Sequence, residues 1–137
     1  MKTKEYLGQY IKAKRYAESC FDRLDEALNI SAKSPRLDGM PKVPADGDLA
    51  DTVAKIERIK QKAEAARQKA LDLAEEIQDV IEAVPDMEEQ GLLRLRYING
   101  MKWEEIADAM GYSVQHIFRL HGDALISAEG FRKDESK

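Results

Sequence analysis

Cysteine, tryptophan and long apolar runs are all scarce in this chain of 137 residues. Cys20 is the only cysteine, which excludes an internal disulfide and a cysteine-based metal site. On a helix, we expect it to pack as a small apolar residue. No stretch approaches the roughly 20 apolar residues that cross a bilayer, and residues 1–10 lack the apolar core of a secretion signal. We therefore expect a cytoplasmic protein with no membrane partner.

Aromatic residues are also few, at 7%, whereas charged residues make up 35% and apolar residues 43%. A chain rich in Ala, Glu, Lys and Leu favours long helices over sheets, so the expected class is all-α. There is no Gly-rich phosphate loop and no Ser/His/Asp signature, and the acidic residues are scattered over surface-like positions. We expect no enzyme, no catalytic residue, no cofactor and no metal.

A first long helix is predicted over residues 1–32. Residues spaced alternately by three and four form a seam along it, as in a helix that packs lengthwise against another. The seam consists of Leu7, Tyr10, Lys14, Ala17, Phe21, Leu24 and Leu28. Residues 33–48 follow, and their prolines and glycines predict a loop or linker.

A second long helix is predicted over residues 49–85, with Asp48 as its N-cap and Pro85 at its end. Its seam keeps the same spacing: Leu49, Thr52, Ile56, Ile59, Ala63, Ala66, Ala70, Leu73, Ile77, Val80 and Val84. Charged runs such as Lys60 to Lys69 are read as a solvated face.

The two seams predict a long antiparallel, coiled-coil-like helical hairpin. Folding back at the loop would place Ala17 near Ala63, and Leu24 and Leu28 near Thr52 and Ile56. Pairing between chains, which would give a homodimer, is the alternative. Since two helices alone bury little surface, we expect further association through them.

Residues 86–130 predict a small C-terminal domain of shorter helices, and residues 131–137 a frayed tail. Asp86 and Glu89 have the spacing of a capping box. Asn99-Gly100 ends the helix that follows. A short helix over 103–110, a turn at 111–113 and a last helix from about 114 to 127 complete the domain.

The stretch WEEIADAMGYSVQHIFRL, from Trp103 to Leu120, meets the requirements of a helix-turn-helix. Ile106-Ala107 offers a small residue where the second helix crosses, and Gly111 tolerates a positive φ in the turn. Core positions recur at Met110, Tyr112, Ile117 and Leu120, with Leu125 and Tyr97 also expected inside. A plain helical hairpin, which needs only some of these features, is the alternative.

The segment LLRLRYINGMKWEEIADAMGYSVQHIFRLHGDAL, Leu92 to Leu125, also resembles a known group. It is similar to the C-terminal part of phage and prophage transcriptional regulators of Gram-positive bacteria, of the ArpU and RinA kind. That part resembles region 4 of sigma factors, which reads promoter DNA. The resemblance implies double-stranded DNA and RNA polymerase as partners, in the cytoplasm of a bacterial host cell.

The N-terminal part of a recognition helix enters the major groove. This places the following residues at the DNA: Ser113, Val114, Gln115, His116 and Arg119, with Lys102 as a backbone contact. Gln115 suits adenine, Arg119 guanine or a phosphate, and Val114 a thymine methyl group. By resemblance, Val114, Gln115 and Arg119 fall where sigma region 4 reads bases. The chain departs from that pattern at Val114, where a basic residue is usual, and at Lys102, where a Ser or Thr cap is usual.

Other polar residues of this domain leave alternatives open. His116 and His121 could reach phosphates, but their spacing of five places them on different faces and does not fit a metal site. For His121, a role in helix packing or hydrogen bonding is favoured over one as a ligand. Arg94 and Arg96 either bind phosphate or pair with acidic residues, the candidates being Glu88, Glu89 and Glu105.

The net charge of −4 is awkward for a nucleic-acid binder. Residues 86–137 carry 7 basic and 10 acidic groups, so the expected DNA-reading domain is itself acidic. Three functions remain open. The first is a DNA-reading transcriptional regulator, the second a protein–protein module that acts on RNA polymerase, and the third a phage packaging protein such as a small terminase subunit.

Overall fold

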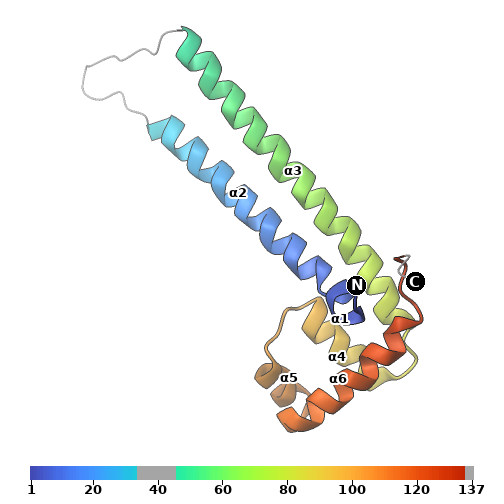
Figure 1. Ribbon diagram of the computed structural model, residues 1–137. Coiled ribbons are helices and arrows are strands. Elements are labelled where there is room, and N and C mark those ends of the chain that lie inside the picture. Colours follow the sequence, from blue (N-terminus) through green and yellow to red (C-terminus); the bar gives the residue numbers. More distant parts are fainter. Residues whose placement is uncertain (34–45, 135–137) are drawn as a thin grey trace. The chain divides into compact units, whose positions relative to one another are not determined.

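A computed structural model describes residues 1–33 and 46–134, and within these ranges the secondary structure is helical with no strand. The predicted all-α class is therefore confirmed. The helices, labelled in Figure 1, are α1 (Thr3–Leu7), α2 (Gln9–Lys33), α3 (Asp46–Ala83), α4 (Met87–Tyr97), α5 (Trp103–Met110) and α6 (Val114–Glu129). Most of the predicted loop and residues 135–137 of the predicted tail lie outside the described residues.

The first long helix is divided, although a single helix over residues 1–32 was predicted. α1 ends at Gly8, whose backbone N–H bonds the carbonyls of Lys4 and Tyr6, and α2 begins at Gln9. Glycine is a weak helix former, so a break costs least at this position. A Cβ at Gly8 would lie 3.3 Å from the Lys4 carbonyl oxygen, closer than ordinary contact.

The second long helix begins earlier than predicted. Because α3 starts at Asp46, Asp48 lies within its first turn, and the N-cap predicted at Asp48 is wrong. The helix ends at Ala83, just before Pro85, as the restriction that proline places on its preceding residue predicts.

The chain divides into two compact units. Unit 1 comprises Met1–Ala13 and Ala70–Lys137, and unit 2 comprises Lys14–Lys69. Each of the two long helices contributes to both units.

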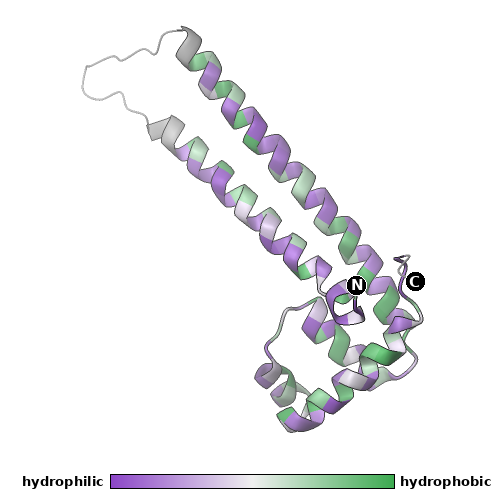
Figure 2. Ribbon diagram, viewed as in Figure 1, coloured by the Kyte–Doolittle hydropathy of each residue, from purple (hydrophilic) through white to green (hydrophobic). Residues whose placement is uncertain are grey.

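Unit 2 has a small core made where α2 and α3 lie side by side (Figure 1). Its buried members are Ala17, Cys20, Ala63 and Ala66, with Phe21 packed against them. The predicted neighbourhood of Ala17 and Ala63 is confirmed, as is the burial of Cys20. The guanidinium of Arg67 lies 5.7 Å from the centre of the Phe21 ring. Hydrophilic residues predominate on both helices of this unit (Figure 2), so little apolar surface is buried here.

Unit 1 has the larger core, to which α1, the end of α3, α4, α5 and α6 all contribute. The buried residues are Tyr6, Leu7, Ile77, Val80, Ile81, Val84, Leu92, Leu93, Tyr97, Ile106, Ala107, Ile117, Ala124 and Ala128. Ile117 and Tyr97 were predicted core residues, whereas Leu120 and Leu125 are partly buried against this core. Unit 1 therefore combines the predicted C-terminal domain with both ends of the described chain.

The start of α4 is capped by Asp86, whose carboxylate accepts hydrogen bonds from the backbone N–H groups of Glu88 and Glu89, at 2.9 and 3.0 Å. This half of the predicted capping box is confirmed. The other half is wrong, because the Glu89 carboxylate instead accepts a 2.6 Å hydrogen bond from the Ser127 hydroxyl. That bond links α4 to the far end of α6, a contact that local sequence spacing could not reveal.

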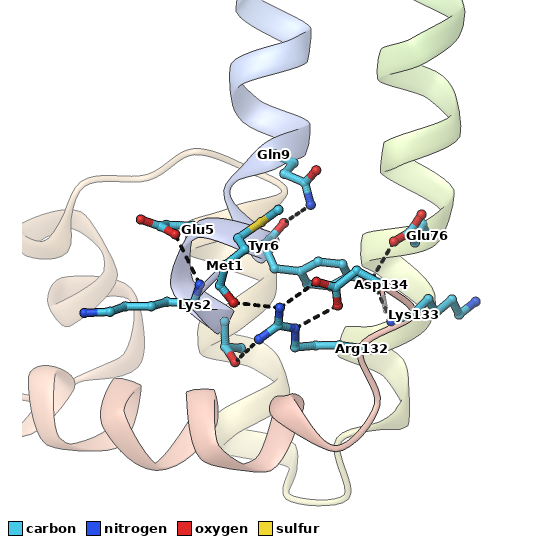
Figure 3. A network of polar contacts seen from close by, with 10 residues as sticks. Met1, Lys2, Glu5, Tyr6, Gln9, Glu76, Arg132, Lys133 and Asp134 are labelled. Carbon is cyan, nitrogen blue, oxygen red and sulfur yellow. Dashed lines mark hydrogen bonds and ion pairs between the residues drawn. The ribbon is translucent and has the colours of Figure 1, made fainter. Parts of the chain in front are cut away.

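Arg132 ties the C-terminal segment to α1, in a network we call the Arg132 clasp (Figure 3). Its guanidinium donates to the Met1 carbonyl at 2.8 Å and to the Thr3 hydroxyl at 3.2 Å. It also pairs with Asp134 at 2.6 Å and lies 5.2 Å from the centre of the Tyr6 ring. The predicted frayed tail is therefore wrong for residues 131–134, because the planar guanidinium finds several fixed acceptors at once.

Tyr6 completes the clasp from the side of α3. Its hydroxyl donates to Glu76 at 2.6 Å and accepts from the backbone N–H of Lys133 at 3.2 Å. Burial, followed by the hydrogen bond to Glu76, raises the pKa of Tyr6 to about 12, so the phenol stays protonated. Lys133 adds an exposed ion pair with Asp79 at 3.1 Å.

Removing the guanidinium should loosen α1 without unfolding the rest of unit 1. In Arg132→Ala, we expect the amides of Thr3–Leu7 to exchange with solvent about tenfold faster or more, because several charge-assisted hydrogen bonds are lost together. Hydrogen–deuterium exchange resolved by peptide or by residue measures this effect. Arg94→Ala, which removes an exposed ion pair elsewhere in unit 1, is the matched control. Unchanged exchange of α1 in Arg132→Ala would show that the clasp does not hold it.

Candidate nucleic-acid interface

The helix α5 begins without the Ser or Thr cap that is usual in the resembling group. The residue at that position is Lys102, whose side chain cannot accept a hydrogen bond. Instead, the Glu105 carboxylate reaches back and accepts from the Lys102 backbone N–H at 2.9 Å. The same arrangement occurs at α1, where Glu5 accepts from the Lys2 N–H at 3.1 Å. The helix thus keeps one half of a capping box in place of the usual side-chain cap.

The turn between α5 and α6 has the predicted geometry. Gly111 adopts a left-handed conformation with φ of 75°, and its N–H bonds the Ala107 carbonyl at 2.9 Å. Ser113 is the N-cap of α6, and its hydroxyl accepts from the His116 backbone N–H at 3.1 Å. A side chain at position 111 would strain this backbone, so glycine is required there.

Ile106 and Ala107 are buried at 0% and 4% exposure, as the predicted close crossing of α5 and α6 requires. Trp103 lies at the entrance of this core. Its ring meets the edge of His121 at 4.6 Å and of Phe118 at 5.4 Å between centroids. These contacts fix the start of α5 against the middle of α6.

His121 is buried between aromatic rings and does not face solvent. Its Nε2 atom is hydrogen-bonded to the Tyr97 hydroxyl at 2.7 Å, and the two rings stack at 5.8 Å. Burial, followed by the positive charges of Lys4 and Arg96, lowers the pKa of His121 to about 4. Burial also raises the pKa of Tyr97 to about 12. His121 is therefore a neutral packing residue, and the option that it reaches a phosphate is wrong.

Arg96 and Arg94 do not pair with the acidic residues considered for them. Arg96 donates to the Met101 carbonyl at 2.8 Å, and its guanidinium lies 4.2 Å from the centre of the Trp103 ring. It therefore supports the segment between α4 and α5 and stacks on the tryptophan. Arg94 forms an exposed ion pair at 3.7 Å with Glu82, at the end of α3.

A further contact holds the turn to α4. The Tyr112 hydroxyl donates a hydrogen bond to the Glu88 carboxylate, which raises the pKa of Tyr112. The ring of Tyr112 also packs against that of His116, with centroids 4.2 Å apart. Tyr112 was predicted as a core position of the motif, and its partner on α4 was not predicted because it lies 24 residues away.

The predicted DNA contacts lie on the first two turns of α6 and just before α5. Gln115, Arg119 and Lys102 are exposed. Ser113 is also exposed, although its hydroxyl oxygen is engaged as the cap. Val114 and His116 are half-buried, the first packed against the core of unit 1 and the second against Tyr112.

Phe118 is a surface residue that the sequence analysis did not select. Its side chain is 50% exposed, although one edge packs on Trp103. Residues three and four apart are neighbours on a helix surface, so Phe118 and Arg119 both adjoin Gln115. Helical phase alone did not indicate this exposure, because Phe118 shares a side of α6 with the buried His121 and the partly buried Leu125.

Positive charge is sparse on this face. Lys102 and Arg119 are exposed and have no ion-pair partner among the described residues. Exposed acidic residues accompany them at Glu104, Asp108 and Asp123. Across residues 1–33 and 46–134, no three His, Cys, Asp or Glu side chains cluster as metal ligands would. In the same part of the chain, no helix has both the length and the apolar character to cross a membrane.

Residues 38–128 match a protein family described as a protein of unknown function, DUF1492. The match covers well over half of the chain and includes all of α3, α4 and α5 and nearly all of α6, so the protein belongs to this family. No curated protein and no solved structure matches the chain.

The buried histidine should make unit 1 sensitive to acid. Since the pKa of His121 is about 4 when folded and 6.5 when unfolded, the unfolded chain takes up a proton first as the pH falls. The contribution of the neutral His121 to the free energy of unfolding is complete above pH 6.5. It is lost as the pH falls towards 4, by up to about 3 kcal/mol. The free energy of unfolding from urea titrations at several pH values measures this loss.

His121→Gln and His121→Phe should both show a shallower fall over this window, each compared with its own stability at pH 7. Carboxylates contribute similarly to all three proteins, so the difference isolates the imidazole. Parallel pH profiles for the natural protein and both variants would contradict the assignment of a neutral buried histidine.

Proposed function

We propose that this protein is a phage-derived transcriptional regulator that reads double-stranded DNA with the first two turns of α6. In this proposal, α5, the Gly111 turn and α6 form a helix-turn-helix of the sigma region 4 kind. The paired α2 and α3 segments of unit 2 form a helical hairpin that associates with a second copy or with RNA polymerase. A bacterial host cell is the corresponding location.

The observation that carries this proposal is the local geometry between α5 and α6. The left-handed Gly111, the Ser113 cap and the buried Ile106-Ala107 pair together satisfy the packing requirements of the motif. They leave the N-terminal turns of α6 with exposed Gln115 and Arg119. A plain helical hairpin needs neither the positive φ nor the small residue at the crossing.

Each exposed side chain has a role that suits the major groove. Gln115 can form two hydrogen bonds with adenine, and Arg119 can bind guanine or a phosphate. The exposed edge of Phe118 suits a thymine methyl group. Lys102 would contact the DNA backbone. His116 and Ser113 would do so as well, with the hydrogen-bonding groups that their contacts within the protein leave free. Val114 is half-buried, so it would offer only a small apolar contact.

A second candidate is a protein–protein module that acts on RNA polymerase without reading DNA. The acidic excess of residues 86–137 favours it, as do two exposed apolar side chains on α6, Phe118 and Ile126, at 50% and 72% exposure. A small terminase-like role in packaging would instead require a ring-sized assembly in solution. Binding to polymerase with no duplex binding would support the protein–protein module.

An unbiased selection of duplexes at low salt, followed by binding titrations, tests the principal proposal. In Gln115→Ala and Arg119→Ala, we expect the preferred site to bind about 5- to 150-fold more weakly, the equivalent of about 1–3 kcal/mol for a lost base contact. Discrimination at the contacted base pair should relax, while circular dichroism stays unchanged.

Gln78→Ala is the matched control, because Gln78 is an exposed glutamine on α3. Its affinity should equal that of the natural protein. Full affinity in both α6 variants would place the reading face elsewhere, and a selection that enriches no sequence would leave the protein–protein module.

A further inference from the structure

The charges of α3 are segregated along its length. Residues 55–69 hold six basic and two acidic residues, whereas residues 70–83 hold acidic residues and no basic one. The basic residues are Lys55, Arg58, Lys60, Lys62, Arg67 and Lys69. This part of α3 belongs to unit 2, so the near balance of the whole chain conceals a locally cationic helix.

Four of these residues share one side of the helix. At about 100° per residue, their spacings of three, four and seven place them within an arc of about 60°. We call this set the basic stripe: Lys55, Arg58, Lys62 and Lys69. It is about 21 Å long at 1.5 Å per residue. Glu57 and Glu64 lie on the other side of α3.

The basic stripe is fully available to solvent. All four side chains are exposed, and none forms an ion pair within residues 1–33 and 46–134. The packing against α2 uses the adjoining face, through Ala63 and Ala66. By contrast, Arg67 lies over the Phe21 ring, so it already has a partner.

This arrangement costs stability in the isolated protein. Like charges three and four residues apart, such as Lys55 with Arg58 and Arg58 with Lys62, repel each other across the helix surface. Asp51 lies on that side four residues before Lys55, but between Lys55 and Lys69 no acidic residue lies there to offset the repulsion. A partner that carries regularly spaced negative charge would relieve it.

We infer that the basic stripe binds the phosphate backbone of duplex DNA, in addition to the contact made by α6. The inference rests on the proposed function. A stripe of about 21 Å spans about six base pairs along a duplex, whose phosphates recur every 3.4 Å on each strand. The α5–α6 face offers only two unpaired cations, Lys102 and Arg119, among acidic neighbours. The stripe therefore supplies most of the phosphate contacts, and α6 supplies the sequence preference.

The test is the salt dependence of binding to a random-sequence duplex of about 30 base pairs, measured by fluorescence anisotropy between about 50 and 200 mM salt. Six contacts, two from the α5–α6 face and four from the stripe, predict a slope of log K against log salt of about −5 for one copy. In the triple variant Lys55→Gln, Lys62→Gln and Lys69→Gln, we expect a slope of about −3 and weaker binding to every sequence.

The matched control is Lys14→Gln, Arg15→Gln and Lys60→Gln, which changes the net charge equally at exposed positions outside the stripe. Its slope should stay within about one unit of that of the natural protein. Circular dichroism and sedimentation of all three proteins verify that the helices and the mass are unchanged.

The outcomes separate the inference from the proposed function. A stripe variant with the natural slope and an intact sequence preference would overturn the inference and leave α6 as the reader. A stripe-dependent slope with no sequence preference would uphold the stripe and overturn reading by α6. A stripe variant whose mass in solution falls while its salt slope is unchanged would show that the stripe binds a second copy of the protein. The acidic half of α3 in that copy would be the contact. This result too would overturn the inference. Absence of duplex binding by the natural protein would overturn both.

Discussion

The interaction on which unit 1 depends is the burial of the neutral His121 imidazole between Tyr97 and Trp103. Each of α4, α5 and α6 contributes one of these three rings, so a single cluster fixes all three helices. Arg96 covers another face of the tryptophan and binds the segment that leads into α5. Because the imidazole stays uncharged, the cluster can exclude water and still satisfy its polar atoms. The exposed turns of α6 are therefore presented by a rigid base.

Few positively charged side chains around these turns are available to contact a partner molecule. In unit 1, three arginines make internal contacts: Arg132 holds the terminal segments, Arg96 stacks on Trp103, and Arg94 pairs with Glu82. In unit 2, the aligned cations of α3 stay in solvent. Under the proposed function, base reading would fall to α6 and backbone binding to α3. Such a division would let affinity and sequence preference change independently.

Local and periodic features were predictable from the sequence, and long-range ones were not. The alternating spacing of three and four identified the neighbours Ala17 and Ala63, because it follows the repeat of the helix. The turn at Gly111 was identified because it depends on residues adjacent in sequence. Phe118 was missed because it shares a side of α6 with His121 and Leu125, so its exposure depends on how the helices pack. The partners of Arg132 and Glu89 could not be foreseen, since they lie 129 and 38 residues away and depend on how the completed helices pack. For the same reason, Arg96 contacts the Met101 carbonyl and the Trp103 ring and not the acidic residues considered for it.

The Arg132 clasp also orders the events of synthesis. Its guanidinium joins the Met1 carbonyl across a separation of 131 residues, whereas the core of unit 2 closes within Lys14–Lys69. On the ribosome, the paired helices of unit 2 can form while the remainder of the chain is still being made. The clasp on α1 can form only after position 132 has left the exit tunnel. A chain that stalls before that point would lack the clasp and would leave Tyr6 more open to solvent, as is general for incompletely folded chains.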